Sequence, residues 1–433
     1  MTHLDLPVRE GMPDGPRLPR VLQTVLFLTA RAVVSPLWRK RYGDTYTVRL
    51  AGGRTIVSVS RAEDIREVFA GSPSVFHAGE GNAILAPVMG ENSVLLLDED
   101  AHLAARKRLM PAFNGAALRG YHDMMTRLAE EAAEKWPLGK PFAAHRTMNA
   151  VTLEIILRVV FGMGEGERLA RLRPLINKVT DIGGVSVLGW AFPRLRNVWP
   201  WKRNIDNLAA ADALLHEEIA ERRGQPDLDT RGDVLSRLLA ADPDAPAAEL
   251  RDHMMTLLLA GHETTATALA WSLHELSRHP AALRAAQAAA DAGDDAHLQA
   301  VAKEAMRLRP VIYSVGRRLT EPTVVAGHRL PRGTVVSPSI GLVQRDPDNF
   351  DAPEEFRPER FLDASPESGT WIPFGGGVRR CIGAGFSLQE AAAILKAVLV
   401  RYDLEPVGSP ERAKSRNITL IPSGGAKIIA RRR

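Results

Sequence analysis

The stretch Phe374-Gly-Gly-Gly-Val-Arg-Arg-Cys381-Ile-Gly383 contains the only cysteine of the 433-residue chain. Glycines let a backbone adopt positive φ and approach a large ligand closely. A thiolate in such a loop, near fixed cations and free backbone N–H groups, is a candidate metal ligand. Zinc and iron–sulfur sites need several protein ligands, and this region offers no further cysteine or histidine. A haem iron needs only one axial protein ligand because the porphyrin supplies the other four, so the loop favours haem over an inert buried thiol.

The composition is that of an ordinary globular protein. Hydrophobic residues make up 45% of the chain and charged residues 25%, which is typical of soluble domains. No repeat or low-complexity linker divides the chain, so we expect residues 1–433 to form a single domain, with residues 1–20 as a flexible N-terminal arm. A single cysteine excludes an intramolecular disulfide and favours a reducing compartment such as the cytoplasm.

The net charge and the N-terminal segment limit the classes of partner that the protein could bind. A net charge of +5 and a pI near 9.4 indicate an acidic partner or surface. No long run of lysine and arginine is interleaved with aromatic residues, which argues against nucleic-acid binding. Val21–Ala30 is apolar but interrupted by Gln23 and Thr24, and it is far shorter than the ~20 residues that cross a bilayer. We expect an amphipathic helix that packs on the body and continues toward Trp38, with peripheral membrane contact as the most that it allows.

Hydrophobic periodicity predicts a mainly α-helical protein with small β-sheets. Residues 101–309 are dominated by helical spacing. Ser387–Val400 is predicted to be a helix, and its positive N-terminal end, just after Cys381, would favour the thiolate. The predicted loops between helices are Ala241–Ala248 and Asp291–Ala296. The predicted strands are Thr45–Leu50 and Thr55–Val59, which form a hairpin, and Thr323–Val325 and Thr334–Pro338.

A polar break in a buried helix is the second feature. The apolar run Met254–Gly261 predicts a buried helix, which then meets His262-Glu-Thr-Thr265. A carboxylate and two hydroxyls inside such a helix are costly unless they are paired or required. The simplest alternative is a helix that emerges into solvent at His262. Because Ala266–Leu273 is apolar again, the break is flanked on both sides, which indicates a functional site.

The pattern Phe-x-x-Gly-x-Arg-x-Cys-x-Gly, at Phe374, Gly377, Arg379, Cys381 and Gly383, resembles the haem-binding loop of the cytochrome P-450 superfamily of haem-thiolate monooxygenases. Further family motifs occur in the correct order and together span residues 102–390. The resemblance implies a single triangular-prism fold, with haem b between the long central helix and the cysteine loop with its following helix. It also implies Cys381 as the axial thiolate ligand of the iron and O₂ as co-substrate.

The resemblance makes the polar break the oxygen-activation segment of the family, here Ala260-Gly-His-Glu-Thr264. Ala260 is expected to contact the cofactor, and Gly261 would thin the helix so that O₂ can sit over the iron. Glu263 would supply protons by way of water, and Thr264 would hydrogen-bond the dioxygen or an ordered water. His262 is expected to pack locally rather than to ligate the iron.

A pair of opposite charges, Glu304 and Arg307, has the i, i+3 spacing that places both on one helix face. Alone the pair is a weak signal, because such pairs are common and usually solvated. The later segment Phe356-Arg-Pro-Glu-Arg360-Phe361 matches the family's stretch between this helix and the cysteine loop. The resemblance implies that Glu304, Arg307 and Arg360 form a buried charge network that holds the loop in shape.

The two haem propionates need cations, which the resemblance assigns to four side chains. His102 and Arg106 are spaced i, i+4 on a predicted helix, and Arg379 lies two residues before the cysteine. In Gly316-Arg317-Arg318 the spacing to Glu321 favours Arg317 over Arg318. One departure from the family is Ser387, where many relatives carry alanine. The other expected cofactor contacts are Phe374, Gly375 and Gly383.

Family analogy places a substrate pocket under residues 76–94, 190–201 and 311–315. These segments are mainly apolar, which predicts a hydrophobic substrate such as a fatty acid, terpenoid, steroid or polyketide. The candidate pocket residues are Phe76, Ile84, Leu85, Val88, Met89, Val311, Ile312 and Tyr313.

The chain contains no flavin or iron–sulfur domain, so electrons are expected from a separate ferredoxin and its ferredoxin reductase. Lys107, Arg108 and Arg380 are candidate docking cations, with ordinary solvated charge as the alternative. An enzymatic alternative is a haem-thiolate peroxygenase or isomerase, but such proteins often lose the acid–alcohol pair that is present at Glu263 and Thr264. A non-catalytic haem-binding protein is the alternative from another class.

Overall fold

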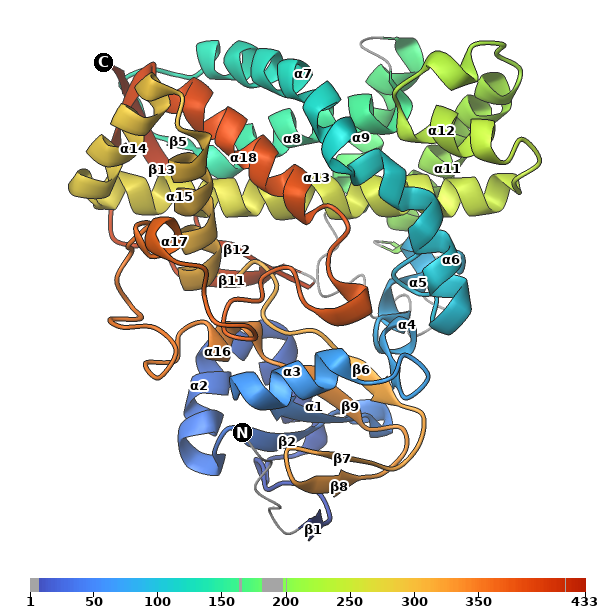
Figure 1. The fold of residues 1–433 in the computed structure, drawn as a ribbon, viewed down its shortest axis with the longest axis vertical. Helices are drawn as coiled ribbons and strands as arrows, with labels where there is room; N and C mark the ends of the chain where they lie inside the picture. The colour runs from blue at the N-terminus through green and yellow to red at the C-terminus, as the bar shows by residue number, and fades with distance from the viewer. Residues whose placement is uncertain (1–7, 163–165, 181–197, 200, 417) are drawn as a thin grey trace.

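The computed structural model describes residues 8–162, 166–180, 198–199, 201–416 and 418–433. Its outline is triangular, with a broad helical part above a narrower part that holds most of the strands (Figure 1). The long helix α13 (Ala247–Arg278) runs across the broad part. The mainly α-helical architecture predicted from the sequence is confirmed.

The remaining helices are α1 (Arg20–Thr29), α2 (Arg31–Tyr42), α3 (Ala62–Ala70), α4 (Ala78–Gly81), α5 (Ala86–Met89), α6 (Glu99–Leu109), α7 (Gly115–Glu134), α8 (Ala144–Phe161), α9 (Glu167–Thr180), α11 (Trp201–Arg223), α12 (Val234–Ala241), α14 (Pro280–Ala292), α15 (Asp295–Leu308), α16 (Ile340–Val343), α17 (Arg360–Asp363) and α18 (Ala384–Leu399). The strands are β1 (Arg9–Glu10), β2 (Thr45–Arg49), β3 (Thr55–Val59), β4 (Phe76–His77), β5 (Phe142–Ala143), β6 (Arg317–Leu319), β7 (Thr323–Val325), β8 (His328–Leu330), β9 (Val335–Pro338), β10 (Tyr402–Pro406), β11 (Ala413–Arg416), β12 (Thr419–Pro422) and β13 (Lys427–Arg432).

Within the described residues the strands form four small sheets. The largest has the order β2-β3-β9-β6-β4, with the predicted antiparallel β2–β3 hairpin at one edge and β9 parallel to β3. The others are β1-β8-β7, β10-β13-β5 and the hairpin β11-β12. The β11–β12 hairpin touches the segment after α15 through a bridge between Ile312 and Thr419. This contact brings the C-terminal part of the chain to the centre of the molecule.

Helix α13 is buried on nearly every side because Leu, Met and Ala occur all round it, as expected of a helix inside a large core. It packs against α8, α15 and α18. A Cβ on Gly261 would lie 3.0 Å from the Ile156 side chain of α8. The missing side chain therefore allows α8 and α13 to pack closely, a reason for this glycine that the sequence did not indicate.

Several predicted boundaries differ from the structure. Helix α18 begins at Ala384, three residues before the predicted start, with Gly383 as its N-cap residue. The loop predicted at Asp291–Ala296 shrinks to two residues, because Gly293 adopts a φ of +72° that ends α14 at once. The Asp294 side chain then accepts a hydrogen bond from the His297 N–H at 3.1 Å and caps α15.

The described part of the expected N-terminal arm is held to the body. Arg9 and Glu10 pair with β8, and the Thr47 hydroxyl donates to the Pro13 carbonyl at 2.6 Å. A Cβ on Gly15 would lie 1.9 Å from the Thr47 carbonyl oxygen. Residues 8–20 are therefore an ordered strap across the sheet rather than a free arm, and residues 1–7 lie outside the described residues.

Candidate functional site

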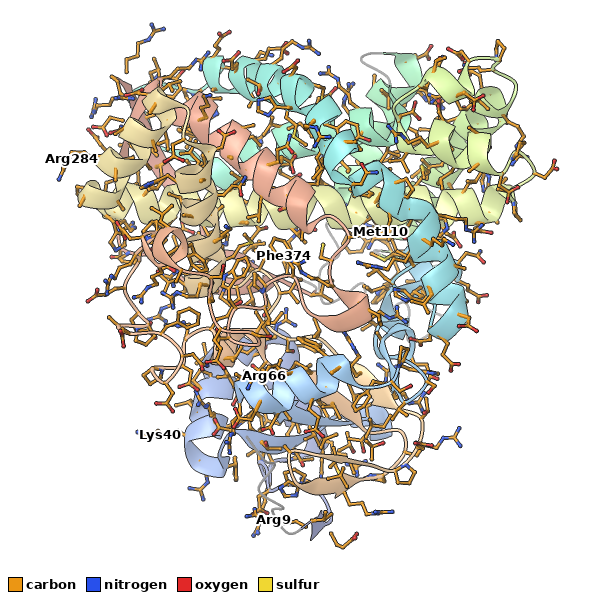
Figure 2. All side chains as sticks on the ribbon, in the orientation of Figure 1. Arg9, Lys40, Arg66, Met110, Arg284 and Phe374 are labelled. Carbon is orange, nitrogen blue, oxygen red and sulfur yellow. The ribbon has the colours of Figure 1, made fainter. Side chains whose placement is uncertain are left out.

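The cysteine loop is shaped by glycines that pack against α3. Gly375 and Gly377 have φ values of +67° and +63°, a region that glycine enters without strain. A Cβ on Gly376 or Gly377 would lie about 2 Å from Phe69, at 2.2 Å from its ring and 2.1 Å from its carbonyl oxygen respectively. The Cys381 N–H donates to the Phe374 carbonyl at 2.9 Å and closes the loop. Figure 2 shows Phe374 near the centre of the molecule.

Cys381 itself is exposed on this loop. The protein packed around the rest of the residue raises the pKa of its thiol by desolvation, against the lowering effects of the Gly383 N–H and of Arg106 and Arg380. The helix end and the cations alone therefore do not make a free thiolate, contrary to the expectation from the sequence. A bound metal ion deprotonates a coordinating thiol outright.

An open face interrupts α13 at the predicted polar break. Between residues 250 and 277 of this helix, the residues that are not buried are Leu259, Ala260, Gly261 and Thr264. Ala260 and Thr264 are spaced i, i+4 and so lie on one face, and the Thr264 hydroxyl donates to the Ala260 carbonyl at 2.7 Å. An exposed alanine in the middle of a buried helix means that the helix borders open space there.

Thr265 joins this part of α13 to the helix that follows the cysteine. Its hydroxyl lies 3.1 Å from the Ser387 hydroxyl in the first turn of α18. Ser387, the departure from the family pattern, is thus bonded across the helix pair. The open face of α13 and the cysteine loop therefore adjoin the same end of α18.

Glu390, one turn further along α18, is completely buried, and neither of its carboxylate oxygens meets the geometry of a hydrogen bond with the described residues. Burial raises its pKa well above the ordinary value, and the Thr265 hydroxyl opposes this only in part. We therefore infer that Glu390 is protonated in the folded protein.

Glu263 and Thr264 point in different directions because successive helical residues are turned by about 100°. The Glu263 carboxylate is buried and faces the β11–β12 hairpin, with its Oε1 3.5 Å from the Thr419 hydroxyl and 3.7 Å from the Arg416 Nε. The sequence reasoning missed Arg416 and Thr419. Their distance along the chain from Glu263 gives no local signal that could have found them.

His262 lies on the opposite side of α13, against α8. It is fully buried, its Nδ1 lies 2.5 Å from the Leu258 carbonyl, and desolvation lowers its pKa to about 4. The backbone carbonyl of His262 accepts a hydrogen bond from Thr152 of α8. His262 is thus a neutral packing residue, as the sequence predicted.

The predicted propionate cations gather in one place. Burial, followed by the charges of Arg379 and Arg106, lowers the pKa of His102 to about 4. Burial lowers the pKa of Arg317 to about 10, with a further lowering by Arg379. Arg106 also interacts with Cys381. The mutual repulsion shows that this cluster holds more positive charge than its surroundings neutralise.

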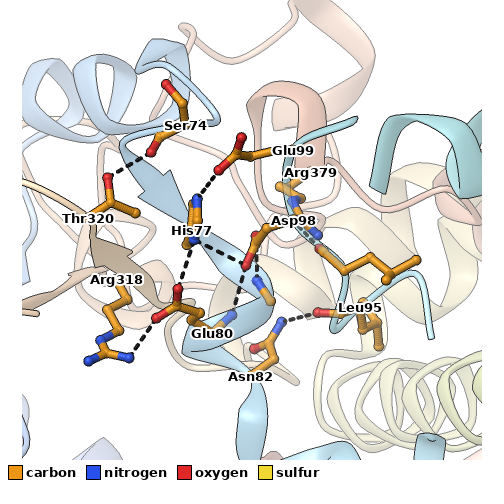
Figure 3. Close-up of polar contacts among 12 residues, drawn as sticks. Ser74, His77, Glu80, Asn82, Leu95, Asp98, Glu99, Arg318, Thr320 and Arg379 are labelled. Carbon is orange, nitrogen blue, oxygen red and sulfur yellow. Dashed lines mark hydrogen bonds and ion pairs between the residues drawn. The ribbon is translucent and has the colours of Figure 1, made fainter. Parts of the chain in front are cut away.

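Asp98 is the acidic residue whose charge acts on both His102 and Arg317 in this cluster. Figure 3 shows its contacts. It pairs with Arg379 and accepts hydrogen bonds from the backbone N–H groups of Gly79 and Glu80 at 2.8 and 3.0 Å. Arg318 points elsewhere, to the Glu80 carboxylate at 2.6 Å, and is exposed. The preference for Arg317 over Arg318 agrees with this geometry.

The predicted charge network is buried at the base of the cysteine loop. Glu304 and Arg307 are both 0% exposed and form two hydrogen bonds, at 2.7 and 2.9 Å. Arg307 also donates to the carbonyls of Gln344, Pro353 and Glu355 at 2.7–3.0 Å. Its guanidinium group therefore ties α15 to three points of the segment that leads to the cysteine.

Arg360 contributes less to the network than the other two residues. Its Nε lies 3.4 Å from Glu304 Oε1, while its terminal nitrogen donates to the Ala352 carbonyl. The connection to the loop runs instead through Gln344, whose side-chain oxygen accepts the Ile372 N–H at 3.0 Å. The Ile372 carbonyl in turn accepts the Gly375 N–H.

The structure does not bring all the predicted pocket residues together. Phe76, in β4 of the five-stranded sheet, packs against Gly71 and the hydrophobic cluster that contains Ile65. Tyr313 is buried against Gly341 and hydrogen-bonds Ser35 of α2. Both side chains thus have packing contacts of their own away from the residues of the open α13 face, and their place in a substrate pocket stays a prediction.

The other pocket candidates lie nearer the helical core. Val88 and Met89 are buried in α5, where the Val88 carbonyl accepts a hydrogen bond from Arg251 of α13. Val311 is buried in the main core, and Ile312 pairs with Thr419. Ile84 and Leu85 are partly exposed on the turn before α5. In the candidate segment 190–201, residues 190–197 and 200 lie outside the described residues.

The three candidate docking cations differ in their contacts. Lys107 and Arg380 are exposed, whereas Arg108 forms an ion pair with Glu249 of α13 at 2.6 Å. Lys107 lies on the helix of His102, and Arg380 precedes Cys381 directly. Both of these exposed cations are thus close in sequence to the groups that surround the thiol.

These features fit a haem. The exposed thiol could ligate the iron, the open face of α13 could form one wall of the site, and the cation cluster lacks the negative charge that two propionates would bring. Within the described residues no other cluster of histidine, cysteine and acidic side chains could hold a metal ion. The observations thus point to one large, doubly anionic cofactor rather than to a bare ion.

Comparison with known proteins agrees with this assignment. The family described as Cytochrome P450 matches residues 13–430. The Mycobacterium tuberculosis protein named cytochrome P450 135A1 is 46% identical, covering 98% of this chain and 96% of its own length. Cytochrome P450 135B1 of Mycobacterium bovis is 43% identical over 97% of this chain and 92% of its own length. The structure of a retinoic acid-bound cyanobacterial protein, CYP120A1, superposes with a TM-score of 0.85 at 23% identity, covering 99% of this chain and all of that one.

Proposed function

Since this chain belongs to the cytochrome P450 family and is a haem monooxygenase in general, we propose that it hydroxylates or epoxidises a hydrophobic small molecule with electrons from a ferredoxin and its reductase. The observation that carries the proposal is the open face of α13 at Ala260 and Thr264, close to the exposed cysteine loop. A binding or sensing protein would need neither the Thr264 hydroxyl at that face nor the buried Glu263 carboxylate that precedes it in the helix.

Bound haem b, held by Cys381 and by the cations His102, Arg106, Arg317 and Arg379, would supply the O₂-activating redox chemistry. Gly376 and Gly377 would keep the loop against α3 so that the sulfur stays at a fixed height. Ala260 presents only a methyl group to the open space, which leaves room there for a ligand.

Glu263 and Thr264 would manage the protons. The Thr264 hydroxyl donates to its own helix, so its lone pairs can accept a hydrogen bond from a water on the open face. The Glu263 carboxylate is turned toward Arg416 and Thr419, and rotation of its side chain would carry a proton from the hairpin side to the open side. Separating donor and acceptor in this way limits uncontrolled protonation.

The substrate class follows from the lining rather than from any relative. Val88, Met89 and Val311 are buried aliphatic groups near the helical core, and no candidate pocket residue carries a charge. Apolar burial then supplies most of the binding energy. A fatty acid, terpenoid, steroid or polyketide suits such a lining.

The exposed cations Lys107 and Arg380 support an acidic electron donor near the cysteine loop. Arg380→Glu should raise the KM for a ferredoxin at least severalfold and leave substrate binding unchanged. The single cysteine supports a cytoplasmic location, where such donors are reduced.

The test of the assignment is spectroscopic and then kinetic. The reduced, CO-bound protein should show the red-shifted Soret band of a thiolate ligand, and Cys381→Ala should lose it. Titration with steroids, terpenes and fatty acids should change the iron spin state for the matching class. Turnover with NADPH, ferredoxin and reductase should form product, and Glu263→Gln should divert reductant to peroxide. Product formation from peroxide alone, with none from the electron-transfer proteins, would favour the peroxygenase alternative.

A further inference from the structure

Helix α1 exposes most of its aliphatic residues and buries a polar one, unlike an ordinary surface helix. Val21 is 67% exposed, and Leu22, Val25 and Leu28 are each more than 40% exposed, whereas Gln23 is 1% exposed. The exposed residues recur at i, i+4 and i+7, so they form one face. The helix packs on the body, as the sequence predicts, through Leu26 and Phe27 against the core cluster that contains Trp38, but the four aliphatic residues named above face outward.

The polar side chains Gln23 and Thr24 of α1 form hydrogen bonds with backbone groups of the protein. The Gln23 amide donates to the carbonyls of Pro16 and Leu18 and accepts the Arg49 N–H at 2.8 Å. The Thr24 hydroxyl donates to the Arg20 carbonyl and accepts the Ala51 N–H. Gln23 therefore explains why the helix cannot rotate to bury its aliphatic residues.

The next helix extends the exposed apolar surface. Val33 and Leu37 of α2 are 65% and 61% exposed and are spaced i, i+4. We call the outward aliphatic residues of these two helices, with the preceding leucine, the α1–α2 face: Leu18, Val21, Leu22, Val25, Leu28, Val33 and Leu37. Exposed aliphatic residues gathered in this way on two successive helices exceed the single scattered apolar residues that need no explanation, and they indicate an interaction site.

The surroundings of the α1–α2 face are strongly basic. Residues 15–43 contain no Asp or Glu. The cations Arg17, Arg20, Lys40 and Arg41 are exposed, and Figure 2 shows Lys40 at the outer edge of α2. Arg39 is used inward, in ion pairs with Asp44 and Asp346.

The face is also firmly attached to the body. The Arg31 guanidinium group donates to the Ile418 carbonyl at 2.8 Å, which ties the start of α2 to the β11–β12 hairpin. Trp38, on the inner side of α2, is buried against Tyr46 of β2. The aliphatic residues therefore stand on a fixed surface rather than on a loose terminal segment.

We propose that the α1–α2 face binds the surface of an anionic phospholipid bilayer, with α1 lying in the interface. Aliphatic side chains in the acyl region and Arg or Lys at the headgroups are what such a surface requires. The ten residues of α1 extend only about 15 Å, and no helix among the described residues is long and apolar enough to cross a membrane. A second copy of the chain is a poorer occupant, because isologous pairing would bring the same cations together.

The test is sedimentation of the haem-loaded protein with vesicles. Phosphatidylcholine vesicles that contain phosphatidylglycerol should carry the protein into the pellet, and pure phosphatidylcholine vesicles should carry much less. Val21→Gln/Val25→Gln should lower the partition coefficient at least about tenfold, because two aliphatic side chains no longer enter the acyl region. Arg17→Gln/Arg20→Gln should lower it by about fivefold per cation.

The matched control is Leu138→Gln/Val324→Gln, which changes two aliphatic residues of 39% and 36% exposure outside the α1–α2 face. It should bind vesicles like the wild-type protein. The CO-bound spectrum of every variant should be unchanged, which separates this proposal from the proposed enzymatic function. Wild-type protein that stays in the supernatant with anionic vesicles would overturn the proposal. So would equal loss of binding in the control, or a dimer in solution that Val21→Gln/Val25→Gln converts to a monomer without affecting vesicle binding.

Discussion

Removal of the Arg307 guanidinium group should prevent the protein from holding its cofactor. Arg307→Ala leaves the Glu304 carboxylate fully buried, with the Arg357 N–H at 2.8 Å and the Arg360 Nε at 3.4 Å as its remaining partners in the described network. Loss of one partner of a buried pair costs about 3–5 kcal/mol. The three carbonyls that also lose their donor would add at least about 1 kcal/mol each. The sum is comparable to the whole stability of a typical protein, about 5–15 kcal/mol.

The assay is haem retention during expression and heating. The ratio of Soret to protein absorbance should fall sharply in Arg307→Ala, and any CO-bound band should disappear at a much lower temperature than in the wild-type protein. Arg345→Ala is the matched control, because Arg345 pairs with Glu354 on the same segment but both side chains are exposed. An exposed pair contributes about 0–1 kcal/mol, so this variant should retain haem.

A double substitution separates charge from packing. Glu304→Met/Arg307→Met removes both charges at once, and it should be less destabilising than the sum of the single changes because no unpaired charge remains. If Arg307→Ala lost no more thermal stability than Arg345→Ala, the buried network would not hold the cysteine loop and the reasoning would be refuted.

Three further outcomes follow from the same structure. Gly377→Ala should lose far more haem than Gly375→Ala. Both substitutions place alanine at a positive φ, which costs about 1–2 kcal/mol, but only the Cβ at position 377 would collide with the Phe69 carbonyl. Equal haem losses in the two variants would contradict this. Glu390→Gln should raise the melting temperature at pH 7. Burial raises the pKa of the Glu390 carboxyl, so the wild-type protein must take up a proton when it folds, whereas a glutamine side chain does not. An unchanged or lower melting temperature would count against a buried carboxylic acid at this position. Besides His102 in the cation cluster, three further buried histidines have a pKa lowered to about 4 by desolvation. The unfolded chain therefore binds more protons below pH 6.5, and these three alone should lower the free energy of unfolding by up to about 4 kcal/mol per pH unit between pH 6.5 and 4, measured by denaturant titration. These histidines are His145, His262 and His274.

The features that the sequence predicted correctly depend on neighbours within one or two helical turns. The i, i+3 spacing of Glu304 and Arg307 was enough to place both on one face, and composition alone marked α13 as buried. The preference for Arg317 over Arg318 rested on spacing and agrees with the observed burial of Arg317. The glycines around Cys381 were recognised in the same way, although their contact with Phe69 was not.

Other features depended on segments far apart in the chain. Arg416 and Thr419 reach Glu263 because the β11–β12 hairpin pairs with Ile312, and no periodicity of α13 encodes that contact. The outward position of Val21 and Val25 on α1 was not predicted, because it depends on hydrogen bonds from Gln23 to backbone that the hydrophobic pattern does not include.

The sequence by itself therefore determined the family and the helical framework of this protein, and it predicts Cys381 as the thiol ligand, since these follow from local spacing along a regular backbone. The tertiary structure alone decided which groups surround Glu263, where Tyr313 points and which face of α1 meets the outside. Those outcomes depend on the register of distant strands and on hydrogen bonds to particular carbonyls, neither of which a linear pattern records.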